Sequence, residues 1–172
     1  MKDGSFPIEQ FRTTKTPFYY YDTALLRRTL DTIKTEATRC GGGNYHVHYA
    51  VKANANRKIL RIISAAGLGA DCVSGGEIKA CLDAGFSPDK IVYAGVGKSD
   101  WEINLGLDAD IAYFNVESIP ELEVIDQLAG EKEKVARVSF RINPDVGAHT
   151  HANITTGLAE NKFGIAMADM KK

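Results

Sequence analysis

The segment His46-Val-His-Tyr-Ala-Val-Lys-Ala-Asn-Ala-Asn56 decides the fold, because its residues alternate in polarity and then lead into a lysine. One face carries His46, His48, Ala50 and Lys52, whereas Tyr45, Val47, Tyr49 and Val51 lie opposite. Alternation with a period of two predicts a β-strand that buries one face and leaves the other polar. We therefore expect a strand over residues 45–51 with Lys52 at its carboxyl end.

Strand and helix patterns alternate along the rest of the chain. Further strands are expected at residues 69–73, 91–96, 111–116 and 135–142, and helices at 58–66 and 77–84. Ser99-Asp-Trp-Glu102 and Ser118-Ile-Pro-Glu121 have the form of capping boxes and predict two more helix starts. Upstream, apolar residues at helical spacing from Leu26 to Ala37 predict a first helix that ends before Gly41. Together these steps predict a parallel α/β architecture.

Two parallel folds fit this order of elements. Five strands complete a flavodoxin-like doubly wound sheet, or they form part of an eight-stranded (β/α)8 barrel, which typically needs about 250 residues. The central strands of a doubly wound sheet are nearly continuously apolar, whereas here polar residues alternate in the first strand and again at Arg137, Ser139, Arg141 and Asn143. This alternation favours the barrel. An exposed edge strand produces the same pattern, so both folds stay open at this point.

Composition excludes several classes of protein. The 172 residues include 21 Lys and Arg against 22 Asp and Glu, so no overall basic field is present to hold nucleic acid or an anionic membrane. No apolar run approaches the length of about 18 residues that predicts a membrane span, and the first residues lack the apolar region of a signal peptide. Cys40, Cys72 and Cys81 form no metal or disulfide motif, which favours a reducing cytoplasm.

Polar side chains gather where the expected strands end. Lys52, Asp71, Ser74, Asn115, Glu117 and Arg141 all fall at or near carboxyl ends, the edge at which barrel enzymes build their active sites. Lys52 follows small alanines and shares this edge with Arg141, so its ammonium is expected to lose a proton more easily than usual. A neutral lysine amine can form a Schiff base. An ordinary surface lysine in a loop is the alternative interpretation.

Other motifs carry weaker signals. The amides of Gly75-Gly76 at a helix start can hold an anion, although a tight turn explains the glycines equally well. Gly95-Val-Gly-Lys98 lacks the spacing of a phosphate-binding loop, so we predict no nucleotide site there. His149 and His151 lack a third ligand, and no metal site is predicted. We expect Tyr19, Tyr20 and Tyr21 to form a half-buried strand and residues 131–134 a solvated turn.

Several segments carry a family resemblance. Tyr49-Ala-Val-Lys-Ala-Asn54, with Thr16–Asp22, Gly69–Glu77 and Arg141-Ile-Asn-Pro144, resembles the pyridoxal-phosphate-dependent decarboxylases with an alanine-racemase-like barrel. Residues 145–151, 154–157 and 161–164 are similar to the diaminopimelate-decarboxylating branch rather than to the ornithine or arginine enzymes. The match extends over nearly the whole chain.

The resemblance implies a cofactor, a reaction and three site residues. The cofactor is pyridoxal 5′-phosphate, Lys52 is its Schiff-base lysine, Asp71 lies beside that lysine, and Arg141 belongs to the cofactor pocket. The intact enzyme is then a carbon-carbon lyase of the cytoplasm, a homodimer that converts the small amino acid meso-2,6-diaminopimelate to L-lysine. Another decarboxylase or racemase of the same fold, and a non-catalytic cofactor-binding or interaction module, are the alternatives. Roles for His149, His151 and Lys162 near the pocket stay open.

The resemblance also implies a division of the chain. Residues 1–44 form an amino-terminal strand and helix, and residues 45–172 form a barrel truncated to about five strand and helix units. The later barrel strands, with the family's histidine, glycine-rich phosphate loop and acidic partner of the pyridine nitrogen, are missing, as are the carboxyl-terminal β-domain and the cysteine motif donated across the dimer. A partial barrel leaves unpaired strand edges. We therefore expect this fragment to be inactive by itself.

Overall fold

The computed structural model describes residues 6–143 and 163–167, in two compact units. The first unit is Met1–His46 and the second is Val47–Lys172, and each is described by itself. His149, His151 and Lys162, together with most of the segments that suggest the diaminopimelate branch, lie outside the described residues. The expected division after residue 44 stays a prediction.

Over its described residues, 6–46, the first unit has two helices, α1 (Ile8–Arg12) and α2 (Thr23–Gly41). The Asp22 carboxylate accepts hydrogen bonds from the amides of Ala24 and Leu25, at 2.9 and 3.0 Å, and so caps α2. The helix ends where Gly42 takes the left-handed conformation, with φ of 57°. The predicted first helix is thereby confirmed, although it includes Gly41 and does not end before that residue.

The prediction of a half-buried strand at Tyr19, Tyr20 and Tyr21 is wrong. These residues lie in a loop, and the Tyr19 side chain is 89% exposed. The described part of this unit offers no strand with which they could pair. Ring contacts replace strand pairing, since Tyr19 stacks on Tyr21 and Tyr20 meets Phe11 edge to face.

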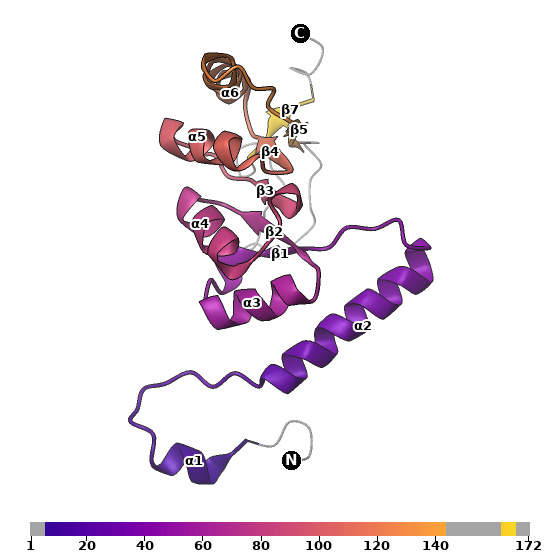
Figure 1. Ribbon diagram of the computed structural model, residues 1–172, viewed down its shortest axis with the longest axis vertical. Coiled ribbons are helices and arrows are strands. Elements are labelled where there is room, and N and C mark those ends of the chain that lie inside the picture. Colours follow the sequence, from indigo (N-terminus) through magenta and orange to yellow (C-terminus); the bar gives the residue numbers. More distant parts are fainter. Residues whose placement is uncertain (1–5, 144–162, 168–172) are drawn as a thin grey trace, which may run out of the picture. The chain divides into compact units, whose positions relative to one another are not determined.

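The second unit is built on a parallel sheet. Its strands are β1 (His48–Ala50), β2 (Gly69–Cys72), β3 (Ile91–Tyr93), β4 (Tyr113–Val116) and β5 (Val138–Phe140), which pair in the order in which they occur along the chain (Figure 1). A flavodoxin-like sheet reverses its strand order at an internal point, whereas successive strands of a barrel lie side by side. The strand order therefore agrees with the barrel and not with the doubly wound sheet.

Four helices cover one face of this sheet (Figure 1). They are α3 (Arg57–Ala65), α4 (Gly75–Ala84), α5 (Asp100–Ala109) and α6 (Ile119–Glu131), and each contacts the next. Single turns of 3-10 helix follow β1 (η1, Val51–Ala53) and precede β3 (η2, Pro88–Lys90). The core between helices and sheet consists of fully buried apolar side chains, among them Leu60, Ile63, Ile78, Ile91, Tyr93, Ile103, Phe114, Val116 and Ile125. Of the two apolar faces predicted from alternation, that of the first strand ends in the fully buried Val51. The prediction is wrong for the last strand, where Val138, Phe140 and Ile142 are 36%, 41% and 40% exposed.

The last expected strand differs in detail. Residues 135–142 were predicted as one strand, but β5 occupies only Val138–Phe140, and β6 (Ile142–Asn143) pairs with β7 (Ile165–Ala166). The Ile165 amide donates to the Arg141 carbonyl at 2.7 Å, so a short further strand follows the five expected ones. A two-residue strand has no periodicity by which a sequence could predict it. Among the described residues, no helix is long and apolar enough to cross a membrane.

Candidate active site

A pocket of about 540 Å³ opens at the carboxyl ends of the sheet strands. Five of the six polar residues expected at this edge line it, which are Lys52, Asp71, Asn115, Glu117 and Arg141. Val73, Ala94, Gly95, Ser139, Phe140 and Phe163 complete the wall. Side chains from four strand ends thus meet in one place, as the barrel geometry requires.

Lys52 lies in η1, immediately after β1. The strand is shorter than predicted, because the chain turns at Val51, whose side chain is fully buried, and the Asn54 amide closes the turn on the Val51 carbonyl at 3.0 Å. Asn56 then caps α3 by accepting from the Lys58 amide at 2.9 Å. Two fixed ends therefore hold Lys52 in a short turn, with its side chain exposed to the pocket.

Asp71 reaches the pocket from β2, which pairs with β1 on one side and β3 on the other. Its neighbours Ala70 and Cys72 are fully buried, so alternation along β2 directs the Asp71 side chain to the opposite, pocket face. The Oδ1 atom of Asp71 is buried and has no hydrogen-bond partner in the described part of the chain. A buried carboxylate oxygen without a donor is costly in a folded protein. It therefore marks a position at which a ligand can supply a donor.

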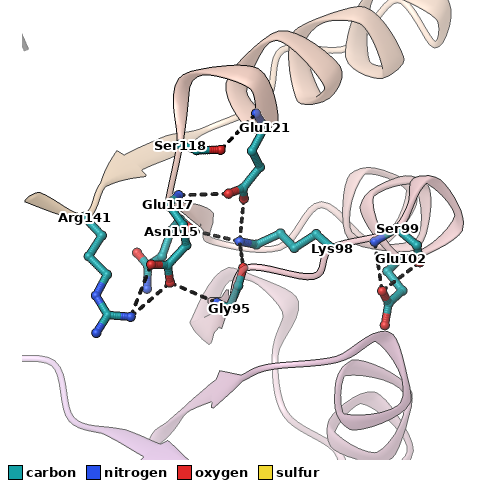
Figure 2. A network of polar contacts seen from close by, with 9 residues as sticks. All are labelled: Gly95, Lys98, Ser99, Glu102, Asn115, Glu117, Ser118, Glu121 and Arg141. Carbon is teal, nitrogen blue, oxygen red and sulfur yellow. Dashed lines mark hydrogen bonds and ion pairs between the residues drawn. The ribbon is translucent and has the colours of Figure 1, made fainter. Parts of the chain in front are cut away.

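Arg141 and Glu117 form an ion pair at the pocket wall (Figure 2). Arg141 Nη1 lies 3.1 and 3.2 Å from the two oxygens of Glu117, whose side chain is only 2% exposed. Glu117 Oε1 also accepts from the Gly95 amide at 3.1 Å. The arginine side chain is 48% exposed, and its guanidinium lies 5.9 Å from the centre of the Phe163 ring. Glu117 thereby holds a cation at the pocket while most of its own surface is covered.

Lys98 is the centre of a second polar group behind this wall (Figure 2). Its ammonium donates to the carbonyls of Gly95 at 2.6 Å and Asn115 at 2.8 Å, and to Glu121 Oε1 at 2.5 Å. The other oxygen of Glu121 accepts from the Glu117 amide at 2.9 Å. Two pocket residues, Gly95 and Asn115, are thus bound through their backbones to one buried lysine.

Ser74 and Gly75 have structural partners instead of pocket positions. Ser74 caps α4 by accepting from the Glu77 amide at 3.2 Å, and it does not line the pocket, contrary to its grouping with the other strand-end residues. The Gly75 amide donates to Glu102 Oε1 at 2.7 Å, so the chain itself supplies an anion at this helix start. The interpretation of the glycines as a turn is therefore the better one for Gly75.

Glu102 joins two helices through the predicted capping box. Its Oε2 accepts from the Ser99 amide at 3.0 Å and from the Ser99 hydroxyl at 2.7 Å. Burial acts to raise the pKa of Glu102, but the hydrogen bonds from the Gly75 and Ser99 amides and from the Ser99 hydroxyl outweigh it and lower the pKa below its usual value. The first predicted capping box is confirmed. In the second, Ser118 caps α6, but the Glu121 carboxylate contacts Glu117 and Lys98 instead of closing the box.

No local sequence pattern predicts the contacts of Lys98 and Glu121. The segment Gly95–Lys98 resembles only a phosphate loop of the wrong spacing, and Glu121 resembles only a capping residue. The available signal is that each Ser-x-x-Glu motif follows a strand end, at 74–77, 99–102 and 118–121, so that its glutamate can contact the neighbouring loop. Within residues 6–143 and 163–167, no group of three His, Cys, Asp or Glu side chains could hold a metal ion.

Comparisons with known proteins agree with this geometry. The family model described as the pyridoxal binding domain of pyridoxal-dependent decarboxylases matches residues 24–172. Diaminopimelate decarboxylase of Bacteroides thetaiotaomicron is 68% identical over 169 residues, which are 98% of this chain and 43% of that protein. The enzyme of the same name from Helicobacter pylori strain J99 is 48% identical, over 91% of this chain and 38% of that protein.

A solved structure extends the likeness to three dimensions. The crystal structure of diaminopimelate decarboxylase from Helicobacter pylori complexed with L-lysine superposes with a TM-score of 0.85 at 44% identity. The match covers 95% of this chain and 41% of that one. The chain therefore spans less than half the length of these relatives.

Proposed function

Because this chain belongs to the family of pyridoxal-dependent decarboxylases and matches their pyridoxal-binding domain, we propose that it binds pyridoxal 5′-phosphate in the pocket around Lys52. The observation that carries the proposal is that three groups meet in one pocket: the Lys52 amine, the arginine that Glu117 holds, and a buried Asp71 oxygen that has no partner among the described residues. We assign residues 45–172 to this cofactor-binding part.

The pocket residues fit the chemistry of that cofactor. Its aldehyde needs an amine, which Lys52 supplies from a short turn exposed to the pocket. Its ring and hydroxyl offer polar groups, and Asp71 Oδ1 is a buried acceptor that still needs a donor. Its anionic groups favour a cation, and Arg141 lies at the wall with about half of its side chain exposed.

Each residue then has a defined part in the reaction. With the cofactor bound, Lys52 would hold it through its amine and would be placed to move a proton at its Nζ atom. Asp71 accepts a hydrogen bond or holds a proton at Oδ1. Arg141, held by Glu117 at 3.1 Å, keeps a positive charge at the pocket throughout. When bound, pyridoxal 5′-phosphate supplies the electron-withdrawing ring that takes up the electrons left behind by the departing carboxylate.

The proposed substrate is meso-2,6-diaminopimelate, and the proposed products are L-lysine and carbon dioxide, a reaction of the carbon-carbon lyases. Support comes from the names of the relatives, at identities of up to 68% among those compared, and from the lysine bound in the Helicobacter pylori structure. We propose this activity for the intact enzyme, since the chain spans only 43% of the Bacteroides relative. The residues that resemble the diaminopimelate branch lie outside the described part of the chain.

Cofactor attachment is tested by reduction. The natural polypeptide that contains this chain is mixed with pyridoxal 5′-phosphate, reduced with borohydride, digested and analysed by mass spectrometry. We expect one pyridoxyl group, on Lys52, and none in a Lys52→Ala variant. Lys58→Ala, at the exposed start of α3, serves as the matched control and should retain the label. A folded protein that is labelled elsewhere, or not at all, would overturn the proposal.

Substrate identity is tested by product analysis. The same polypeptide is assayed with meso-2,6-diaminopimelate, L-ornithine and L-arginine, and released carbon dioxide and amines are quantified. We expect L-lysine from the first substrate and no turnover of the others. Turnover of ornithine or arginine, or racemisation without carbon dioxide, would assign another reaction of the same fold.

We also propose a homodimer in the cytoplasm. The family resemblance supports the dimer, and sedimentation of the purified polypeptide at several concentrations tests it. Three free thiols, two of them buried at Cys72 and Cys81, are consistent with a reducing compartment. Fractionation of cells that express the natural protein tests the location.

A further inference from the structure

We propose that Lys98 is a positioning residue of the pocket, holding Gly95, Glu117 and Arg141 in the arrangement that receives the cofactor. This inference rests on the proposed function, because it assigns a role in the same pocket. Lys98 itself does not line the pocket, so it acts through the residues that do.

The contacts of Lys98 use its full hydrogen-bonding capacity. An ammonium has three donors, and three acceptors lie at 2.5 to 2.8 Å, namely the carbonyls of Gly95 and Asn115 and the Glu121 carboxylate. The Tyr93 ring lies on a further side, with its centre 5.2 Å from Nζ. The Lys98 side chain is 0% exposed and that of Glu121 only 11%. The ammonium is therefore fixed from several directions.

These contacts join three segments that are separate in sequence. Gly95 follows β3, Asn115 belongs to β4, and Glu121 is in the first turn of α6. Lys98, just before α5, binds all three at the carboxyl edge of the sheet (Figure 2). A neutral apolar side chain at position 98 can pack there but cannot bind two carbonyls and a carboxylate.

The network continues from Lys98 to the cation at the pocket. Lys98 fixes the carbonyl of Gly95, and the amide of the same residue donates to Glu117 Oε1 at 3.1 Å. Lys98 also fixes Glu121, whose second oxygen accepts from the Glu117 amide at 2.9 Å. Glu117 is therefore held at its backbone and at its carboxylate, and it in turn holds Arg141.

Burial makes a purely stabilising role a poor explanation of this arrangement. Removing an ammonium and a carboxylate from water is expensive, and replacement of a buried ion pair by apolar residues is often neutral or stabilising. The pair also lies at the pocket edge and contacts the backbone of two pocket residues. If the pocket requires Gly95 and Glu117 in fixed positions, that requirement explains why a buried lysine and glutamate are present and why they lie at the pocket edge.

The test compares three variants of the natural polypeptide that contains this chain. Lys98→Met removes one charge of the buried pair, and Lys98→Met with Glu121→Gln removes both. Lys132→Met is the control, because this surface lysine pairs with Asp108 over a similar distance in sequence, 24 residues against 23. For each, the dissociation constant of pyridoxal 5′-phosphate is measured below the unfolding temperature, with the pH dependence of the bound cofactor's absorbance. Assays of the reaction separate kcat from KM.

We expect a specific pattern of results. Both Lys98 variants should bind the cofactor more weakly by roughly tenfold to 100-fold, by analogy with the loss of residues that orient the ligands of a bound metal. The absorbance should titrate at a different pH, because Arg141 is no longer held. Lys132→Met should bind the cofactor within about twofold of the parent protein, as an exposed ion pair contributes little.

A folded Lys98→Met protein with the parent's dissociation constant and absorbance titration would overturn the inference, even if its unfolding temperature were lower. Where Lys98→Met does not fold, the same outcomes are measured on the charge-balanced double variant. A parent protein that takes up no cofactor contradicts the proposed function instead, so the two failures are distinguishable.

Discussion

Ion pairs between described residues connect the segments around α5 and α6 near both ends of these helices, and the surroundings of the two ends differ. Lys98 and Glu121 lie at the pocket end with side chains 0% and 11% exposed, whereas Lys132 and Asp108 lie at the other end with 29% and 57% exposed. The partners are 23 and 24 residues apart in sequence. Equal chemistry therefore has unequal consequences, because burial removes the water that would otherwise satisfy each charge.

The polar partners differ in the same direction. The buried ammonium binds two backbone carbonyls as well as a carboxylate, so its loss leaves several acceptors unsatisfied at once. The exposed ammonium of Lys132 binds both oxygens of Asp108, at 2.9 and 3.0 Å, and water can take its place. In barrel enzymes, residues at the carboxyl ends of the strands serve the reaction, whereas residues at the opposite end serve stability.

The largest effect is expected from Lys98→Met. Removal of one partner leaves the Glu121 carboxylate buried without its cation, which costs about 3 kcal/mol of unfolding free energy or more. Urea unfolding followed by circular dichroism measures this loss. The double change Lys98→Met with Glu121→Gln should recover part of it, since no charge is then left unpaired. A midpoint equal to that of the parent protein would show that water reaches the site.

A smaller effect is expected from Glu102→Gln, at the same end of the barrel. The Glu102 carboxylate accepts from the Gly75 amide and closes the capping box with Ser99. A glutamine side chain at position 102 has one accepting oxygen in place of two, so it can keep only some of these hydrogen bonds. A lost cap costs about 1 kcal/mol. The thermal unfolding temperature should therefore fall by a few degrees. Glu123→Gln, on an exposed position of α6, is the control and should leave it unchanged.

The same glutamate predicts a dependence on pH. Its pKa lies below the usual value of 4.5, so its contribution to stability is fully present above pH 4.5 and is lost as the pH falls through the lowered pKa. The difference in unfolding midpoint between the parent and Glu102→Gln should be constant near neutral pH and shrink below pH 4.5. A difference that grows on acidification would contradict the sign of the shift.

The fold and the pocket edge could be predicted where the signal is local in sequence, and the contacts between distant segments could not. Alternation at residues 45–51 and the capping boxes at 99–102 and 118–121 are local patterns. They predicted the first strand, two helix starts and the edge where Lys52, Asp71 and Arg141 meet. The contacts of Lys98 join segments about 20 residues apart, and no local pattern contains them. The strand predicted at Tyr19 is wrong for a related reason. A segment with high strand propensity forms a loop where the described part of its unit offers no strand to pair with.

The smallest effect is expected from Lys132→Met, which therefore tests the comparison most sharply. The lysine attraction lowers the pKa of Asp108, chiefly through their hydrogen bond, but that carboxylate lies in water, where salt screens it and other cations replace the lysine. Lys134 lies 3.5 Å from the same carboxylate and remains after the change. The unfolding midpoint should stay within error of the parent at physiological ionic strength, and any difference seen at low salt should disappear on adding salt. A loss as large as that of Lys98→Met would mean that position along the helices, and not burial, decides what an ion pair contributes.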